Sequence, residues 1–361
     1  MSRDDAKASE PGSQAANAAR HNYPLNQWYV AAGRKELGRG LLRRQLLGKW
    51  IVMYRTEAGA PVALLDWCPH RGFQLSNSTL VGDEIVCGYH GMRFAPDGRC
   101  TKVPTQDVVP EQLRARSYPV VEKWHWVWIW LGDPQKADPE LIPHTGFEDR
   151  QGYFHNFFFC YPIQGNYLLL HDNLLDATHV SFLHGGLVDN PDSAEVAKTK
   201  FKMEVSGAMI RTVRDINHFV PIGPNATILG LREGVAVRRR LVTETHLPSL
   251  VIINTRTFDL STDQLITEQI ASLPVVPGNP RLCYHFAAFS NSFPWGGEPQ
   301  DVEMMRTVVH QDSIGIESNQ RYIDEGGPDY VEVSVQADVA ALRARRMIAA
   351  MLYAEAGPTA R

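Results

Sequence analysis

Two cysteines and two histidines alternate within one short segment, CPHRGFQLSNSTLVGDEIVCGYHG, and this order restricts the folds and metals open to the chain. Cys68 is followed two residues later by His70, and Cys87 is followed three residues later by His90. Zinc fingers place their cysteines together and their histidines together, whereas each of these pairs contains one residue of each type. The pattern therefore predicts a different kind of metal site.

The chemistry of these four donors favours iron over zinc. Replacing two thiolates by neutral imidazoles on one iron of a [2Fe–2S] cluster lowers the negative charge of the cluster and raises its reduction potential. Two loops that each give one cysteine and one histidine can place both cysteines on one iron and both histidines on the other. The segment thus resembles the Rieske motif, with Cys68, His70, Cys87 and His90 as cluster ligands. A mononuclear zinc knuckle is the alternative.

A second signal lies in HDNLLDATHVSFLHGG, which contains Asp176, His179 and His184. Two histidines supply part of a 2-His-1-carboxylate triad, which holds Fe(II) by three ligands and leaves positions open for oxygen. Residues five apart lie about 140° apart around a regular helix, so a helix near residues 172–184 must end or distort before His184. The two glycines after His184 favour such a stop. His171 fits neither pattern and is expected to be structural.

The carboxylate of the triad is expected from a long helix over about residues 299–324. Its apolar residues recur at three- and four-residue steps and mark an inward face: Val302, Met305, Val309, Ile316 and Ile323. Asp312 falls on that stripe, where a carboxylate is costly unless it is paired or bound to metal. We therefore predict Asp312 as the third ligand. A buried, hydrogen-bonded aspartate is the alternative.

The rest of the sequence falls into two regimes. From about Trp28 to Asp133 the segments are short and β-branched, with hairpins predicted around Gly59 and around the Pro-Asp-Gly turn of RFAPDGRCTKV. WHWVWIWL indicates a buried strand. GDPQKADPELIP indicates a linker, because it has three prolines in twelve residues.

These patterns predict an α+β protein. We expect a disordered tail over residues 1–22, an all-β Rieske [2Fe–2S] domain over 23–135 and a catalytic domain with mononuclear iron over 136–361. The catalytic domain is expected to contain strand-like runs between about 200 and 290, the long helix, and a terminal helix in QADVAALRARRMIAAMLYAEAG.

Composition excludes several classes of partner. The net charge of -4 gives no sign of nucleic-acid binding, which normally shows as a basic face, and the 361 residues include no apolar run long enough to span a membrane. Five cysteines are an odd number spread thinly over a long chain, which argues against a disulfide framework and for a reducing cytoplasm.

Together the two metal motifs make the sequence resemble the oxygenase (α) subunits of the Rieske non-haem iron oxygenases, over roughly residues 23–330. DNLLDATHVSFLH, the Trp-rich strand that closes in LGDP, and HQDSIGIES are most similar to the vanillate O-demethylase and dicamba O-demethylase branch. Toluenesulfonate methyl-monooxygenase is a further relative. The resemblance implies a helix-grip catalytic domain with the substrate pocket inside its curved antiparallel sheet, Asn173 beside the iron, and a homotrimer without β-subunits.

Asp176 is expected to join the two metal sites. It precedes His179 by three residues, so its carboxylate is predicted to accept the free ring N–H of His179. The resemblance implies that the Rieske domain of one subunit docks against the catalytic domain of the next. His90 or His70 of that neighbour would then bond the same carboxylate.

The resemblance also implies the reaction. Electrons pass from NADH through a separate flavin and iron–sulfur reductase, because this chain shows no GxGxxG stretch and no second cysteine-rich cluster. O2 and a methoxylated aromatic acid then give a hemiacetal, which releases formaldehyde and a phenol. Ring hydroxylation or cis-dihydroxylation of another aromatic compound is the alternative reaction. A Rieske electron carrier without catalysis is the alternative class, and the second metal motif counts against it.

No substrate-binding residue is predicted. REGVAVRRRLVTETH offers Arg232, Arg238, Arg239 and Arg240, but a run of arginines is usually a solvated strand face or a subunit contact. Asn254, in VIINTRTF, is a comparably weak candidate.

Overall fold

The computed structural model describes residues 23–144, 150–295 and 298–356, and the tail predicted over 1–22 lies outside them. The N-terminal part consists of three small antiparallel sheets, with the orders β1-β10-β9, β2-β3-β4 and β5-β6-β7-β8. A short 3-10 turn, η1 (Leu75–Asn77), lies between β4 and β5, and two more, η2 (Pro134–Lys136) and η3 (Pro139–Leu141), follow β10 and lead toward the C-terminal part. The strands are β1 (Trp28–Gly33), β2 (Leu42–Leu46), β3 (Lys49–Arg55), β4 (Pro61–Leu65), β5 (Thr79–Val81), β6 (Glu84–Val86), β7 (Arg93–Phe94), β8 (Cys100–Lys102), β9 (Val120–Lys123) and β10 (Trp126–Trp130).

The hairpins and the buried strand predicted in this part are confirmed. β3 pairs with β4 across the turn at Gly59, and β7 pairs with β8 across the turn at Gly98. Gly98 has a φ of +81°, and a Cβ there would lie 1.9 Å from the carbonyl oxygen of Ala115, so only glycine fits. β10 is buried along its whole length.

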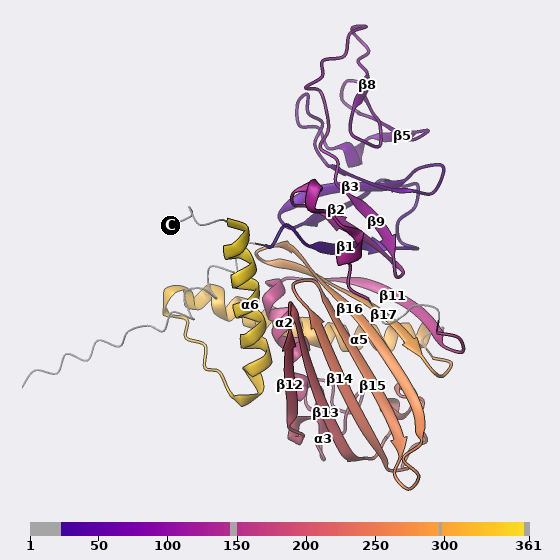
Figure 1. The fold of residues 1–361 in the computed structure, drawn as a ribbon, viewed down its shortest axis with the longest axis vertical. Coiled ribbons are helices and arrows are strands. Elements are labelled where there is room, and N and C mark those ends of the chain that lie inside the picture. Colours follow the sequence, from indigo (N-terminus) through magenta and orange to yellow (C-terminus); the bar gives the residue numbers. More distant parts are fainter. Residues whose placement is uncertain (1–22, 145–149, 296–297, 357–361) are drawn as a thin grey trace, which may run out of the picture.

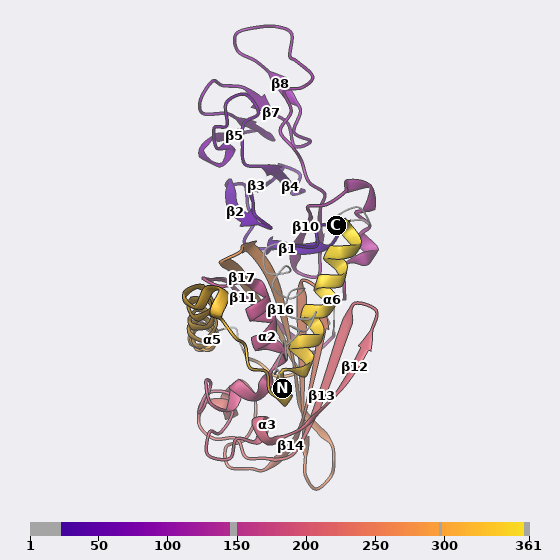
Figure 2. The same cartoon turned by 90° about the vertical axis from the view of Figure 1, so that its left-hand side faces the viewer.

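The C-terminal part is one seven-stranded antiparallel sheet with helices on its inner face (Figures 1 and 2). The strand order is β11-β17-β16-β15-β14-β13-β12, so the first and last strands of this part are neighbours. The sheet and its helices form the helix-grip arrangement that was predicted. The elements are β11 (Phe154–Ile163), α2 (Tyr167–Leu175), η4 (Ala177–Ser181), α3 (Glu195–Lys198), β12 (Phe201–Ser206), β13 (Met209–Phe219), α4 (Pro224–Ile228), β14 (Val237–His246), β15 (Leu250–Asp259), β16 (Leu265–Asn279), β17 (Leu282–Asn291), α5 (Pro299–Gly326), η5 (Gly327–Asp329), η6 (Gln336–Asp338) and α6 (Val339–Ala356).

A continuous hydrophobic core joins the two parts. Trp126 of β10 meets Phe286 of β17 edge to face, with ring centroids 5.8 Å apart, and both belong to one buried cluster. The Ser249 hydroxyl donates a hydrogen bond of 2.8 Å to the carbonyl oxygen of Trp28. The sheet β1-β10-β9 therefore packs on the outer face of the large sheet, which leaves the inner face to the helices.

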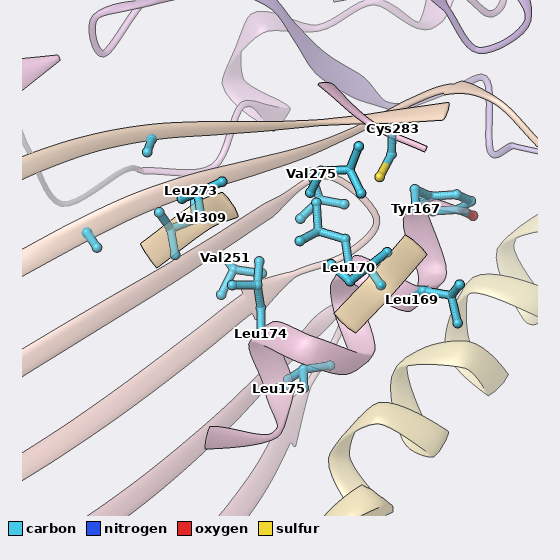
Figure 3. Packing of buried hydrophobic residues seen from close by; sticks show 14 of the residues in the cluster. Tyr167, Leu169, Leu170, Leu174, Leu175, Val251, Leu273, Val275, Cys283 and Val309 are labelled. Atoms are coloured by element: carbon cyan, nitrogen blue, oxygen red, sulfur yellow. The ribbon is translucent and has the colours of Figure 1, made fainter. Parts of the chain in front are cut away.

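Helix α2 packs into the curve of the large sheet. Figure 3 shows Leu170 and Leu174 of α2 among side chains that include Val251 of β15 and Val275 of β16. All four side chains are buried, and each such burial contributes about 1.5–3 kcal/mol relative to exposure. This packing fixes the position of the polar segment that follows α2.

The start of α2 is also fixed by local chemistry. The side chain of Asn166 caps the helix by accepting a hydrogen bond of 3.0 Å from the backbone N–H of Leu168. The preceding residue, Gly165, lies against α5, because a Cβ at this position would come within 2.7 Å of Ile316 Cγ2. A larger residue would push α2 away from α5, the helix that carries Asp312, and α2 leads directly into the segment that carries His179 and His184.

The predicted elements of the second part differ from the structure in one place. The long helix expected over 299–324 corresponds to α5, and the terminal helix corresponds to α6. The helix expected near residues 172–184 begins earlier and ends at Leu175. The predicted domain boundary at residue 135 falls in η2, and we retain it as a proposal. No helix in the described ranges combines the length and the apolar composition needed to cross a membrane.

Glu268 of β16 is the centre of a buried polar network. Its carboxylate accepts hydrogen bonds of 2.8 Å from Asn254 Nδ2 and Arg256 Nε, and another from the hydroxyl of Tyr153. Arg150 adds an ion pair at 3.2 Å. Burial opposes ionisation of this carboxyl, but the hydrogen bonds from Tyr153, Asn254 and Arg256 outweigh it and lower the pKa of Glu268 from 4.5 to about 2.

This network predicts a pH-dependent contribution to stability. A carboxyl with a lowered pKa stabilises the folded state above its unfolded pKa, and the effect is lost as pH falls through the folded pKa. Glu268→Gln is therefore expected to lower the free energy of unfolding by up to about 3 kcal/mol at pH 7, and by progressively less between pH 4.5 and 2. Urea titrations of the wild type and the variant at several pH values measure the loss of unfolding free energy at pH 7 and its decrease at lower pH.

The matched control is Glu204→Gln on the edge strand β12. Glu204 is largely exposed and pairs with Arg211 at 3.4 Å, so its loss should change stability by less than about 1 kcal/mol. Equal losses in the two variants, or a Glu268→Gln loss that does not depend on pH, would contradict the role given to the network.

Candidate metal centres

The two loops that carry the cysteine–histidine pairs have the same backbone construction. In each, the cysteine N–H donates to the carbonyl oxygen five residues later, and the N–H of a glycine four residues later returns a bond to the cysteine carbonyl oxygen. Both glycines have a positive φ, +67° and +69°. The bonds are Cys68 N to Phe73 O (2.8 Å), Gly72 N to Cys68 O (2.9 Å), Cys87 N to Met92 O (2.8 Å) and Gly91 N to Cys87 O (2.9 Å).

The four donors are sorted by type. Cys68 and Cys87 are buried, whereas His70 and His90 are exposed, with ring centroids 4.8 Å apart. Burial raises the pKa of the Cys68 thiol to about 11, so a nearby cation is needed to hold it as thiolate. Sulfur inside and imidazole at the surface fit a two-iron cluster with a different ligand type on each iron.

Asp176 ends one helix and begins the next. Its backbone is extended at the C-terminus of α2, and its carboxylate caps η4 by accepting bonds from Thr178 N at 2.9 Å and Thr178 Oγ1 at 2.7 Å. This break turns the chain, so that His179 on η4 and His184 after it approach each other, with ring centroids 5.2 Å apart. The distortion that both histidines require is therefore present, and it begins before His179.

Asp312 of α5 completes a group of three donors. His184 Nε2 lies 3.1 Å from Asp312 Oδ1, and His179 Nε2 lies 3.5 Å from the same atom. One ligand atom from each residue lies within 4.8 Å of the other two. Asn173 of α2 donates a hydrogen bond of 2.9 Å to Asp312 Oδ1, which places it beside this group as predicted.

Both histidines are held in the orientation that a metal requires. His179 Nδ1 lies 2.5 Å from the backbone carbonyl oxygen of Asp176, and His184 Nδ1 lies 2.8 Å from Gln311 Oε1. Because both partners are acceptors, each Nδ1 carries the proton and each Nε2 presents its lone pair toward Asp312. Two imidazoles and one carboxylate on one side of a centre are the donor set of a non-haem Fe(II) site, and they fit that metal.

The electrostatics of this group agree with the geometry. Burial opposes the charge on Asp312, but His184, which as the imidazolium can donate from Nε2 when no metal is bound, and the nearby His179 outweigh it and lower the pKa of Asp312. Burial lowers the pKa of His179 and thereby favours the neutral ring that binds metal. At neutral pH one carboxylate and at least one neutral imidazole are therefore available to a cation.

One predicted contact is wrong, and two neighbours of the site were missed. The backbone carbonyl of Asp176, and not its carboxylate, accepts from His179, because the carboxylate is used to cap η4. In the sequence, the only signal for Gln311 as a partner of His184 is that it is a polar residue next to Asp312. His285 of β17 is buried, neither ring nitrogen has a hydrogen-bond partner among the described residues, and no sequence motif marks it. His171 is structural as expected, with Nε2 2.8 Å from the carbonyl oxygen of Pro248.

A cavity of about 160 Å³ lies beside His179, His184 and Asp312, between the helices and the inner face of the sheet. Its walls are mainly apolar and include Leu174, Ile253 and Phe289, with His285 and Arg239 among the few polar side chains. The volume is close to the ~150 Å³ of a dry engineered cavity that binds benzene. The space therefore suits a single aromatic ring with small substituents.

The run of arginines is divided between the two faces of β14. Arg238 and Arg240 are ion-paired with Asp263 and Asp215, at 2.5 and 2.8 Å, as expected for an outer strand face. Arg239 between them faces the cavity and is only 2% exposed. Asn254 does not reach the cavity, since its amide donates to Glu268.

Comparisons with known proteins agree with both centres. Residues 27–119 match the Rieske [2Fe–2S] domain, and residues 163–354 match the vanillate O-demethylase oxygenase C-terminal domain. The vanillate O-demethylase oxygenase subunit of Pseudomonas sp. (strain HR199 / DSM 7063) is 27% identical over 92% of this chain and 96% of its own length. The toluene-4-sulfonate monooxygenase iron–sulfur subunit of Comamonas testosteroni is 37% identical, over 50% of this chain and only about half (52%) of its own length.

Solved structures of dicamba monooxygenase share the fold. One, bound to 3,6-dichlorosalicylic acid, superposes with a TM-score of 0.85 at 28% identity, over 94% of this chain and 100% of the other. Another, which holds non-heme iron and dicamba, has a TM-score of 0.78 at 27% identity, over 93% and 99% of the two chains. A Rieske [2Fe–2S] cluster and a mononuclear iron are thus the cofactors of this fold. The chain belongs to the vanillate O-demethylase oxygenase family and is an oxidoreductase of the Rieske oxygenase class.

Proposed function

We propose that this chain is the oxygenase component of a monooxygenase that removes a methyl group from a methoxylated, single-ring aromatic acid. The observation that carries the proposal is the ring-sized apolar cavity beside two imidazoles and a carboxylate. Relatives that act on vanillate and dicamba, both methoxylated aromatic acids, support the reaction type. The cavity volume disfavours a polycyclic substrate.

The roles of the site residues follow from their contacts. We assign Cys68, His70, Cys87 and His90 to the cluster, and His179, His184 and Asp312 to the mononuclear iron. When bound, the iron supplies oxygen activation, and the cluster supplies electrons one at a time. Asn173 and Gln311 hold Asp312 and His184 in place by hydrogen bonds, and the apolar walls exclude water from the ring.

The overall chemistry balances with an external electron donor. The methoxy compound, O2, two electrons and two protons give the hydroxymethyl ether and water, and the ether then breaks down to a phenol and formaldehyde. The electrons come from NADH through a separate reductase, and the relatives named as oxygenase components or as an iron–sulfur subunit of a monooxygenase system support such a partner.

We also propose a homotrimer in which electrons pass between subunits. The sheet β5-β6-β7-β8, beside the cluster loops, lies at the end of the molecule away from α2 and α3 in both views (Figures 1 and 2). Cys68 and Cys87 pack in one buried cluster with residues of this sheet, so the loops that carry the exposed His70 and His90 belong to that end of the molecule. A neighbouring subunit that brings its His70 or His90 to the half-buried Asp176 would provide a short route.

The proposal predicts formaldehyde as a product. A panel of methoxybenzoates is supplied to the protein together with a reductase of this class and NADH, and oxygen uptake, NADH oxidation and formaldehyde are followed. Substrate-dependent oxygen uptake with formaldehyde is the expected result, and the matching ethoxybenzoates should give acetaldehyde. Oxygen uptake with hydroxylated or dihydroxylated rings and no aldehyde would replace demethylation by ring oxidation. No substrate-dependent uptake, with a cluster that is still reduced by NADH, would favour an electron carrier.

A further inference from the structure

A positively charged side chain points into the cavity that Asp312 also lines. Arg239 of β14 is only 2% exposed and lines the same cavity as His179 and Asp312. Its Nε and Nη1 atoms are buried and have no hydrogen-bond partner among the described residues. A guanidinium has five donors in a planar fork, so most of its bonding capacity here is unused.

The surroundings of Arg239 include no counter-ion in contact with it. The charge of Asp189 acts on Arg239, but no ion pair within 4.0 Å joins Arg239 to a carboxylate of the described residues. Asp189 Oδ2 accepts from the Ser181 hydroxyl at 2.5 Å and from the backbone N–H of Val196 at 3.2 Å, and Asp189 Oδ1 is buried with no hydrogen-bond partner among the described residues. The guanidinium lies instead over the ring of Phe219, with its carbon 4.3 Å from the ring centroid.

The neighbouring arginines show what a structural arginine looks like on this strand. Arg238 and Arg240 point to the opposite face and each has an aspartate partner. Burial lowers the pKa of Arg239 to about 10, which still leaves it charged at neutral pH. A buried charge without a partner is costly, so its presence in the cavity indicates a partner that arrives from outside.

We propose that Arg239 binds the anionic group of the substrate, a carboxylate or sulfonate on a single aromatic ring. The proposal rests on the proposed function and adds to it the residue that selects an acid over a neutral aromatic. The planar fork of the guanidinium can give two parallel hydrogen bonds to such a group. With the anion held on β14, the ring lies against the apolar walls and its oxidisable substituent points toward His179 and Asp312.

Binding of acid and amide pairs tests this directly. Each pair keeps the ring and changes only the charge: 3-methoxybenzoate with 3-methoxybenzamide, and toluene-4-sulfonate with toluene-4-sulfonamide. Dissociation constants are measured by calorimetry for the wild-type holoenzyme, for Arg239→Met and for the control Arg240→Met. The two pairs also separate carboxylate from sulfonate recognition.

The wild type and Arg240→Met are expected to bind at least one acid about tenfold to a hundredfold more tightly than its amide. Arg239→Met should lose this preference. Without ligand, the thermal midpoint of Arg239→Met should stay level or rise, because an unpaired buried charge has been removed. A merely structural arginine would lower the midpoint and leave the acid preference intact.

Arg239→Lys and Arg239→Gln separate charge from folding if the methionine variant is unstable. Lysine should keep part of the acid preference and glutamine should lose it. An unchanged preference in Arg239→Gln, or no preference in the wild type, overturns the role of Arg239. Formaldehyde assays test the proposed function separately. If the wild type forms formaldehyde but Arg239→Gln keeps the acid preference, only the role of Arg239 is refuted. If Arg239→Gln loses the acid preference but no methoxy compound gives formaldehyde with the wild type, only the demethylation is refuted.

Discussion

Replacing Asp312 by alanine is expected to remove the mononuclear iron, to leave the Rieske cluster in place and to lower turnover by more than about a hundredfold. Asp312 Oδ1 lies within 3.5 Å of Nε2 of both His179 and His184, so the variant keeps only two neutral donors. The cluster loops lie in the N-terminal part and share no contact with Asp312. Their visible absorbance should therefore persist.

Total iron and the cluster spectrum measure this result together. In Asp312→Ala the iron content should fall to that of the cluster alone, while reduction by dithionite still bleaches the Rieske absorbance. Glu303→Ala is the control, because Glu303 lies on the same helix with its side chain exposed to solvent. Iron at the wild-type level in Asp312→Ala would assign the third ligand to another residue.

Asp176→Asn should keep both metals and almost abolish turnover. Asparagine can still accept the bond from Thr178 N, so the junction between α2 and η4 should persist, and His179 bonds to the backbone of residue 176 in either case. The change removes the negative charge that we propose to accept a histidine N–H from the neighbouring Rieske domain. The expected effect is a loss of more than about a hundredfold in turnover.

Stopped-flow measurements locate that loss. The cluster of Asp176→Asn should be reduced by the reductase at the normal rate, and its re-oxidation by substrate and oxygen should be slow. Thr178→Val serves as control, since it removes the hydroxyl that bonds the same carboxylate at 2.7 Å and keeps the charge. Rapid re-oxidation in Asp176→Asn would show that electrons take another route.

Most of the candidate metal ligands could be proposed from the sequence because they occur in two short segments. The spacing of Cys68, His70, Cys87 and His90 alone indicates two similar loops, and the loops are indeed built alike. Asp312 was found by a different signal, a carboxylate on an apolar helical stripe, and it is buried there at 4% exposure. Local periodicity carries this kind of information well.

What the sequence could not supply depends on tertiary contacts. Strand alternation places Arg239 opposite Arg238 and Arg240, but which face of β14 meets the cavity is decided by how seven strands order around α2 and α5. The partner of His179 was mistaken for a similar reason. A regular helix would have placed the Asp176 carboxylate beside His179, and the break at Asp176 turns it toward Thr178.

A single-turnover experiment tests most directly whether the two centres together demethylate an aromatic acid. Holoenzyme with a chemically reduced cluster, free of reductase, is mixed with oxygen and a methoxybenzoate that it binds. We expect rapid return of the Rieske absorbance only when substrate is present, with formaldehyde formed in proportion to the clusters oxidised, and neither event in Asp312→Ala. Re-oxidation of the cluster at the same rate without substrate would contradict the claim that the two centres together demethylate an aromatic acid. Re-oxidation with substrate but without formaldehyde would contradict it as well.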